Sequence, residues 1–189
     1  MMQLGENTMD NSEKTILVTG GSGYIGSVTC KLLVDSGYNV INLDRTKRDL
    51  KGVTQYPFDI DNHQVKGLLQ LIRPDAIIHL AADHSVPKSM SSPDSTYANN
   101  VANTISLLNN AVSAGVTHFI FSSTSSVYGN TDGSPSKETD PIAPLTPYGR
   151  SKAMVEQILA DFSKSFDFTY ASLRYFNAAG SYEGVGYQL

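Results

Sequence analysis

Short apolar runs alternate with longer segments of helical periodicity along most of this chain. The apolar runs predict strands at residues 15–19, 38–44, 53–60, 75–82, 117–123 and 168–176. The segments between them predict helices: the first ends near Leu33, and the others cover about 62–72, 93–114 and 148–165. Because the strands are apolar on both faces and alternate with helices, the pattern predicts a doubly wound α/β fold, a parallel sheet with helices on each side.

The chain has 189 residues, which is the length of one ordinary domain. Its 40% hydrophobic and 17% charged content is typical of a globular protein. The first fourteen residues lack a hydrophobic signal core, and residues 1–14 are therefore predicted to be a flexible leader. Residues 15–180 then form the predicted domain, and residues 181–189 follow it as a short tail.

Charge and cysteine content narrow the classes of function. The net charge is −4 and no basic run occurs, which argues against nucleic acid or an anionic membrane as a partner. No apolar run approaches the ~18 residues that a spanning helix needs. The one cysteine, Cys30, lies in a predicted helix as a small buried apolar group and excludes a disulfide within the chain. We therefore expect a cytoplasmic location and no metal site.

A cluster of glycines follows the first predicted strand, in the sequence TGGSGYIG at residues 19–26. Gly21, Gly23 and Gly26 give the Gly-x-Gly-x-x-Gly spacing, and Gly20 gives a wider variant of it. The acidic residue Asp44 ends the second predicted strand about twenty residues later, which completes the context of the dinucleotide fingerprint. Glycines let the backbone approach a pyrophosphate, whose charge a helix N-terminus stabilises.

The nature of the acid indicates which dinucleotide binds. The Asp44 carboxylate can accept hydrogen bonds from both hydroxyls of an adenosine ribose and would repel a 2′-phosphate. NAD is therefore favoured over NADP, although the neighbouring Arg45 weakens that preference.

Other predicted strand ends carry small or hydroxyl-bearing residues. They read FDI at 58–60, LAA at 80–82 and SSTSS at 122–126. In a parallel sheet the ligand crevice lies beyond the carboxyl ends of the strands. The small residues Ala81 and Ala82 would let a cofactor lie against the backbone, and the hydroxyls at 122–126 offer hydrogen-bond donors beside it.

Tyr148 and Lys152 lie four positions apart in the sequence TPYGRSKAMVEQ, at the start of the last predicted helix. A tyrosine with a pKa near 10 is a poor base at neutral pH, but a lysine one turn away and an oxidised nicotinamide would favour the phenolate. That phenolate could accept a proton from a substrate hydroxyl while hydride leaves the same carbon. Thr124 is the best-placed hydroxyl to share the proton. By itself the pair is equally typical of a helix surface; the glycine fingerprint favours the catalytic interpretation.

From about residue 14 to 180 the sequence resembles the extended short-chain dehydrogenases/reductases, and among them the UDP-glucose (UDP-galactose) 4-epimerases. The resemblance rests on VTGGSGYIGS, LD, FDI, HLAA, NNV, FIFSSTSSVYG, PLTPYGRSKAMVEQIL and LRYFNAAG. It implies a Rossmann-like domain, NAD as cofactor and a UDP-sugar as substrate. In the implied reaction, hydride passes from C4 of the sugar to NAD⁺, the 4-keto sugar turns over, and hydride returns to its opposite face.

The resemblance also implies roles for individual residues. Tyr148 corresponds to the catalytic base, Lys152 to its partner that also holds the nicotinamide ribose, and Thr124 to a hydroxyl that binds the sugar. Asn177 corresponds to a nucleotide-sugar contact. The implied cofactor contacts are Gly20, Gly23, Tyr24, Ile25, Gly26, Asp44, Asp59, Ile60, Ala81, Ala82, Asn99, Ser122, Lys152 and Tyr175. For Asn99 and Tyr175 a packing or capping role is the alternative.

Two positions depart from related enzymes. Ser126 stands where nucleotide-sugar dehydratases and decarboxylases have an acidic group, which disfavours those reactions because elimination needs an added acid. His84 stands where related epimerases often have a lysine near the cofactor, and by itself it is typical of a solvated loop.

The chain stops after SYEGVGYQL, where family members continue into a smaller C-terminal domain that grips the nucleotide of the sugar. With that domain absent, NAD binding is expected to survive better than turnover. Three hypotheses follow: a 4-epimerase of UDP-hexoses, a non-catalytic NAD-binding protein, and a reductase or dehydratase of another nucleotide sugar. The resemblance further implies a homodimer formed by the helices at 93–114 and 148–165.

Overall fold

The computed structural model describes residues 13–130 and 134–186, so most of the predicted leader lies outside the described residues. Within them, parallel strands form a sheet in the order β3-β2-β1-β4-β5-β6. The strands are β1 (Thr15–Thr19), β2 (Asn39–Leu43), β3 (Val53–Tyr56), β4 (Ala76–His79), β5 (His118–Thr124) and β6 (Thr169–Tyr175). The strand order reverses between β1 and β4, which is where doubly wound folds bind ligands. The predicted fold class is confirmed.

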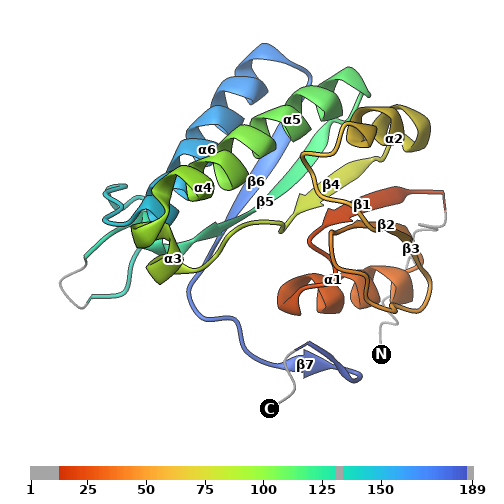
Figure 1. Ribbon diagram of the computed structural model, residues 1–189, viewed down its shortest axis with the longest axis horizontal. Helices are drawn as coiled ribbons and strands as arrows, with labels where there is room; N and C mark the ends of the chain where they lie inside the picture. The colour runs from red at the N-terminus through yellow and green to blue at the C-terminus, as the bar shows by residue number, and fades with distance from the viewer. Residues whose placement is uncertain (1–12, 131–133, 187–189) are drawn as a thin grey trace, which may run out of the picture.

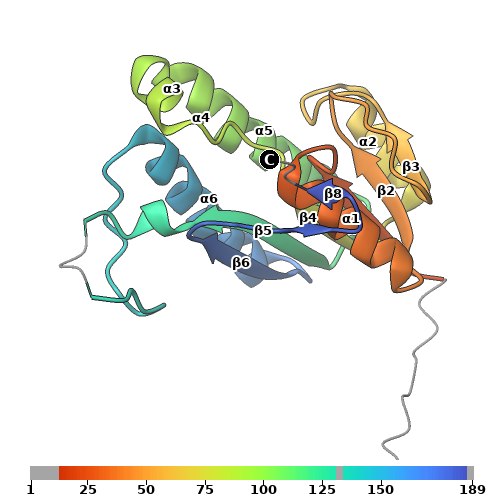
Figure 2. The same cartoon turned by 90° about the horizontal axis from the view of Figure 1, so that it is seen from below.

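Helices cover both faces of this sheet (Figures 1 and 2). They are α1 (Tyr24–Asp35), α2 (Gln64–Ile72), α3 (Val86–Ser91), α4 (Pro93–Tyr97), α5 (Asn103–Ser113) and α6 (Pro147–Ser165). Helices α2, α5 and α6 pack on one face, and α1 packs on the other. Among the described residues, none of the helices has the length and apolar content to cross a membrane.

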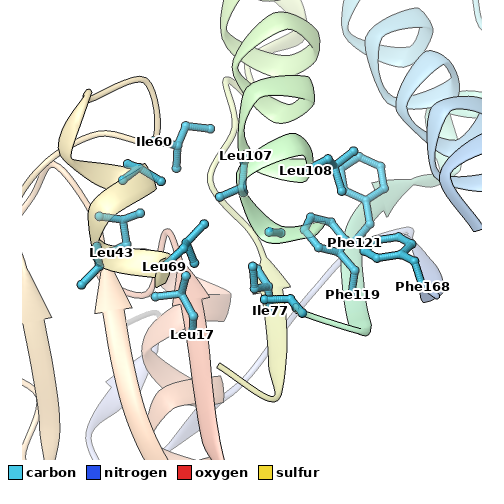
Figure 3. Packing of buried hydrophobic residues seen from close by; sticks show 14 of the residues in the cluster. Leu17, Leu43, Ile60, Leu69, Ile77, Leu107, Leu108, Phe119, Phe121 and Phe168 are labelled. Atoms are coloured by element: carbon cyan, nitrogen blue, oxygen red, sulfur yellow. The ribbon is translucent and has the colours of Figure 1, made fainter. Parts of the chain in front are cut away.

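The alternation of side chains along β1 explains the two layers. Leu17 points into the larger cluster, where Ile77 and Phe119 from neighbouring strands meet Leu107 and Leu108 of α5 (Figure 3). The adjacent residues of β1 face the opposite side, because successive strand residues alternate between faces. They are Ile16 and Val18, which pack with Cys30 of α1. Both faces of the sheet centre are therefore apolar, as the sequence predicts.

The predicted long helix at 93–114 is interrupted, which corrects the sequence analysis. A π-helical turn, η1 (Ala98–Ala102), separates α4 from α5. The side chain of Asn100 is buried in this turn and bonds the backbone of Asp83, accepting from N at 2.8 Å and donating to O at 2.9 Å. Bulges of the π type concentrate at functional sites.

The helix α3 was not predicted; its N-cap is Ser85, whose hydroxyl accepts a hydrogen bond from the Lys88 N–H.

Two strands end earlier than the apolar pattern predicts. The third ends at Tyr56, because Pro57 has no backbone N–H for the ladder, and the fourth ends at His79. Residues 58–60 and 80–82 therefore lie in loops beyond the sheet. Loops at the carboxyl ends of parallel strands can contact a ligand. Because β3 and β4 are shorter than predicted, residues 58–60 and 80–82 belong to such loops.

The segment after residue 180, predicted as a tail, forms a short hairpin of β7 (Ser181–Tyr182) and β8 (Val185–Gly186). The hairpin packs on α1, where the Lys31 ammonium lies 2.9 Å from the Glu183 carboxylate. The Tyr24 hydroxyl donates to the Gly180 carbonyl at 2.8 Å. Figure 1 shows the chain passing from β6 along the edge of the sheet to reach this position.

Candidate active site

A cavity of about 860 Å³ opens at the carboxyl ends of the strands. Every residue predicted from the sequence to contact a cofactor or substrate lies in its lining, although those residues span positions 20 to 177. The cavity also has lining residues to which no contact was assigned from the sequence, among them Phe58, Asp83, Val86 and Phe176. Asp83 follows the predicted alanines directly, whereas Val86 lies on the unpredicted helix α3.

The glycine loop lies against the end of β4. Gly20 has a φ of 75°, and a Cβ there would come within 2.7 Å of the Ala81 nitrogen. The Gly23 N–H donates to the Gly20 carbonyl at 3.1 Å, which closes the turn. The loop is therefore packed so closely that side chains are excluded, and its backbone forms one wall of the cavity. Helix α1 begins immediately afterwards with Gly23 as its N-cap.

A buried asparagine that the sequence analysis missed fixes this loop. The Asn42 side chain accepts a hydrogen bond from the Gly21 N–H at 2.8 Å and donates to the Gln55 side chain at 2.8 Å. It also donates to the Ser22 hydroxyl at 3.1 Å. The available signal was an asparagine inside an apolar strand, since a buried amide has to find hydrogen-bond partners.

Asp44 lies where the fingerprint predicts it, at the end of β2. Its carboxylate accepts hydrogen bonds from the Ser22 N–H at 3.0 Å and the Thr46 N–H at 2.8 Å, one on each oxygen. Arg45 is 71% exposed at its side chain and lies 3.8 Å from the Asp59 carboxylate. The oriented Asp44 carboxylate keeps free lone pairs for two ribose hydroxyls, while Arg45 is paired with another acid.

Tyr148 lies in the first turn of α6, whose N-cap Thr146 accepts a hydrogen bond from the Gly149 N–H at 3.1 Å. Thr124, the last residue of β5, lines the cavity together with Tyr148, close enough to act on its phenol as a hydrogen-bond partner. Burial raises the pKa of Tyr148, and the bond to Thr124 offsets part of that rise. The sequence predicts that Lys152 lowers this pKa; in the protein alone the pKa is raised, and Lys152 is not among the groups that shift it.

Lys152 is directed at the backbone of β5. The residue is only 3% exposed, and its ammonium donates to the Ser122 carbonyl at 2.8 Å. The same ammonium lies 4.8 Å from the centroid of the Phe121 ring, a cation–π contact. Burial lowers the pKa of Lys152 to about 7. The amino group can therefore hold or release a proton near neutral pH.

Replacing Lys152 by methionine is expected to raise the free energy of unfolding at pH 7 by about 2–4 kcal/mol. The folded protein releases the Lys152 proton near a pKa of about 7, whereas the unfolded chain keeps it up to a pKa of 10.5. The unfolded state thus binds more protons between these values, so the penalty of burying the ammonium is complete below pH 7 and declines as pH rises.

Urea unfolding between pH 6 and pH 10 checks this prediction, with Lys164→Met as the control because Lys164 is an exposed lysine of the same helix. The gain of Lys152→Met should shrink toward pH 10. A gain that stays constant with pH would contradict the assigned burial penalty.

A buried histidine connects the cavity wall to the helices. The Thr104 hydroxyl donates to the Asn100 carbonyl at 2.9 Å, so it accepts from His79 Nε2–H, also at 2.9 Å. His79 Nδ1 then accepts from the Thr19 hydroxyl at 2.7 Å. Burial, aided by the Lys152 charge, lowers the pKa of His79 to about 3. This neutral histidine is a structural link, and the sequence analysis did not single it out.

The π-helical turn ties two walls of the cavity together. Besides Asp83, the Asn100 amide contacts the Ser151 hydroxyl at 3.1 Å, and that hydroxyl donates to the Tyr148 carbonyl at 2.7 Å. Its neighbour Asn99 lines the cavity and donates to the Asn100 side chain at 3.1 Å. The turn therefore positions the loop after β4 relative to the first turn of α6.

The other residues that the sequence singles out lie at the cavity or in the core. His84 is exposed and lines the cavity, and Ser126 lies in the lining within the 3-10 turn (Ser125–Val127) that follows β5. Cys30 is buried, as predicted, and burial together with the Asp44 charge raises the pKa of its thiol to about 12. Within the part of the chain that the structure describes, no cluster of His, Cys, Asp and Glu could hold a metal ion.

The residues present fit a dinucleotide. A Cβ at Gly26 would lie 2.2 Å from the Gly20 carbonyl oxygen, so the glycine loop and α1 are in close backbone contact. A ligand can therefore lie only on the outer side of this loop. The N-cap Gly23 has no side chain to occupy the first N–H groups of α1, which can face a pyrophosphate. The Asp44 carboxylate lies in the lining of the same cavity.

Comparison with known proteins supports this interpretation. Residues 16–187 match the NAD dependent epimerase/dehydratase family. A UDP-glucose 4-epimerase of Rhizobium leguminosarum bv. trifolii is 41% identical over 177 residues, which cover 90% of this chain and 54% of that protein. The chain thus spans about half the length of the curated relatives it matches.

Solved structures agree. UDP-glucose 4-epimerase from Brucella ovis in complex with NAD superposes with a TM-score of 0.88 at 35% identity, covering 93% of this chain and 56% of that one. The enzyme from Stenotrophomonas maltophila with bound NAD and formylated UDP-arabinopyranose gives 0.86 at 35% identity, covering 93% and 57%. The family match covers nearly all of the chain, and it agrees with the sheet order and the glycine loop. The chain therefore belongs to the NAD dependent epimerase/dehydratase family.

Proposed function

We propose that this chain is the NAD-binding part of an NAD-dependent 4-epimerase that interconverts UDP-glucose and UDP-galactose. The observation that carries the proposal is the meeting of two groups of residues in one cavity. The glycine loop and Asp44 line part of it, and the Tyr148 phenol lines another part together with Thr124. The relatives named UDP-glucose 4-epimerase support it.

The chain's own residues would hold the cofactor in a defined order. The backbone of the glycine loop and the start of α1 would bind the pyrophosphate, and Asp44 the adenosine ribose. Asp59 and Ile60 would lie beside the adenine, and Lys152 near the nicotinamide ribose. Bound NAD⁺ would supply a hydride acceptor that returns the hydride later in the same cycle.

The proton chemistry falls to Tyr148. Its phenol would accept the proton of the sugar C4 hydroxyl and return it after the 4-keto sugar has turned over. Thr124 would orient that hydroxyl through its own bond to the phenol. A positive charge placed beside Tyr148 would stabilise the phenolate and reverse the rise in pKa that burial causes. Asn177, at the cavity edge, would contact the nucleotide sugar.

The purified chain provides the test. We expect a nicotinamide absorbance to copurify with it, and UDP-galactose and UDP-glucose to interconvert without net release of reduced cofactor. Failure to bind NAD under any condition would contradict the proposal. Net release of NADH would instead indicate a reductase or dehydratase.

A second candidate is an NAD-binding protein without turnover. Bound NAD together with no interconversion of either UDP-sugar would support it.

We further propose a homodimer formed by α4, α5 and α6, and a cytoplasmic location. Light scattering coupled to size exclusion would give twice the mass of 20.4 kDa for the dimer. A monomeric mass would contradict it. Cell fractionation tests the location.

A further inference from the structure

A nearly buried ion pair lies directly behind the wall that carries the Tyr148 and Lys152 side chains. Glu156, one helical turn after Lys152 on α6, pairs with Arg174 of β6 through Nη2 and Oε2 at 2.7 Å. Arg174 Nε lies 3.1 Å from the other carboxylate oxygen, so the pairing is bidentate. The side chains of Glu156 and Arg174 are only 12% and 22% exposed.

The pair extends into the strand between them. The Ser123 hydroxyl donates a short hydrogen bond to the Glu156 carboxylate. Ser123 is buried, and in the parallel register of β5 and β6 it is the partner of Arg174. Arg174 also donates to the Tyr128 hydroxyl at 2.9 Å and to the Glu138 carbonyl at 3.2 Å. One guanidinium therefore joins β6, the loop after β5 and helix α6.

The position of Ser123 in the chain links this cluster to the cavity. Ser122, the residue before it, supplies the carbonyl that accepts the Lys152 ammonium. Thr124, the residue after it, lines the cavity with Tyr148 and acts on the pKa of its phenol. Because strand side chains alternate, Ser123 points away from its two neighbours, and its bond to Glu156 fixes the backbone that carries both of them.

We propose that Glu156, held by Arg174, is a positioning residue that clamps the end of β5 onto α6 through Ser123. The clamp sets the distances from Lys152 to the Ser122 carbonyl and from Tyr148 to the Thr124 hydroxyl. The clamp rests on the proposed function only because these two distances are expected to matter for turnover. Glu156 itself is not in the lining of the cavity, so it would act through the strand.

Titration of the Lys152 amino group in the isolated full chain tests the clamp. Lysines labelled with ¹³C at Cε are followed by NMR from pH 5 to pH 11, and Lys152→Met identifies the signal. In the wild-type chain the Lys152 midpoint is expected near 7. Ser123→Ala and Glu156→Gln are each expected to raise that midpoint by about one pH unit, because a loosened strand end admits water to the ammonium.

The direction in which the Lys152 midpoint shifts distinguishes a positioning role of Glu156 from the effect of its charge. The ionisable group shown to interact with Lys152 is His79 on β4. Along α6, Tyr148 precedes Lys152 by one turn and Glu156 follows it by one turn, with Arg174 paired to Glu156. Removing the negative charge of Glu156 would by itself lower the Lys152 midpoint. Positioning predicts a rise, and it predicts the same rise for Ser123→Ala, which leaves the ion pair intact.

Asp161→Asn is the matched control. Asp161 lies on the same helix and pairs with Lys164 at 3.3 Å, but both side chains are 76% exposed. The same change from carboxylate to amide should leave the Lys152 midpoint unchanged there. Thermal melting of each variant accompanies the titration, and Ser123→Ala decides the question if Glu156→Gln does not fold.

Two results would overturn the inference: an unchanged midpoint in Ser123→Ala, or a lowered midpoint in Glu156→Gln. The measurement needs neither bound NAD nor a UDP-sugar. A chain that fails to bind NAD would therefore refute the proposed function and leave the clamp standing, whereas an unmoved Lys152 refutes the clamp alone.

Discussion

Replacing Gly26 by alanine is expected to weaken NAD binding about 100-fold, which corresponds to about 2.7 kcal/mol. A Cβ at this position would lie 2.2 Å from the Gly20 carbonyl oxygen and 2.6 Å from the Gly21 Cα. Both are backbone atoms, so no side-chain rotation can relieve the overlap. The glycine loop has to move away from α1, and with it the N–H groups proposed to bind the pyrophosphate. Isothermal titration with NAD measures the loss.

The same substitution also costs stability, by about 1–3 kcal/mol, because it overfills a closely packed contact. The matched control is Gly67→Ala in α2. Gly67 is likewise a helical glycine without a positive φ, and a Cβ there meets nothing within 4 Å. That variant is expected to gain about 0.5–1 kcal/mol and to bind NAD as the wild type does. Unchanged NAD affinity in folded Gly26→Ala would show that the dinucleotide does not lie on this loop.

Replacing Tyr148 by phenylalanine is expected to slow the interconversion of UDP-glucose and UDP-galactose by a factor of about 10²–10⁴, the usual contribution of a general base. The phenylalanine keeps the aromatic ring in the first turn of α6 and removes only the hydroxyl on which Thr124 acts. NAD affinity should stay within about twofold, since Tyr148 contributes a proton and little binding energy.

A second measurement reads the same group without turnover. Burial raises the pKa of Tyr148 in the protein alone, so the phenol is neutral at pH 7. Adding NAD⁺ is expected to lower that pKa, which appears as tyrosinate absorbance at lower pH in the wild type but not in Tyr148→Phe. The control is Tyr170→Phe, which removes a phenol from the exposed edge of β6. Full activity in Tyr148→Phe would refute the role assigned to Tyr148.

Local spacing was enough to predict the parts of the site that lie within one turn or one strand. Gly20, Gly23 and Gly26 were recognisable because a loop that approaches another backbone excludes side chains, and the structure shows those close approaches. Asp44 followed from its place at the end of an apolar strand. The boundaries of α6 were predicted to within one residue, since Thr146 and Pro147 are strong start signals.

The polar contacts between distant segments could not be predicted. Asn42, His79 and Glu156 each look ordinary in the sequence, and each acquires its role from partners that are 13 to 60 positions away. The break between α4 and α5 belongs to the same class, because the buried Asn100 amide bonds the loop at Asp83 across 17 positions. An apolar pattern with helical period gives no sign of such a contact.

The direction of the Lys152 side chain shows the limit most clearly. The four-residue spacing places Lys152 beneath Tyr148, and it predicts a charge that acts on the phenol. In the folded protein the ammonium bonds the Ser122 carbonyl and lies over Phe121, and its own pKa falls to about 7. Burial is a property of the assembled layers, so neither the direction nor the size of this shift is encoded in the spacing.

Periodicity and spacing alone therefore gave the six strands of the sheet and their alternation with helices, the glycine loop, the acid that follows β2 and the Tyr-x-x-x-Lys pair. These depend on periodicity and on short-range stereochemistry, which act between near neighbours. The tertiary structure decided which of these residues share one cavity, how deeply each is buried and which polar groups hold it in place. Those features arise only when the sheet brings the carboxyl ends of separate strands together.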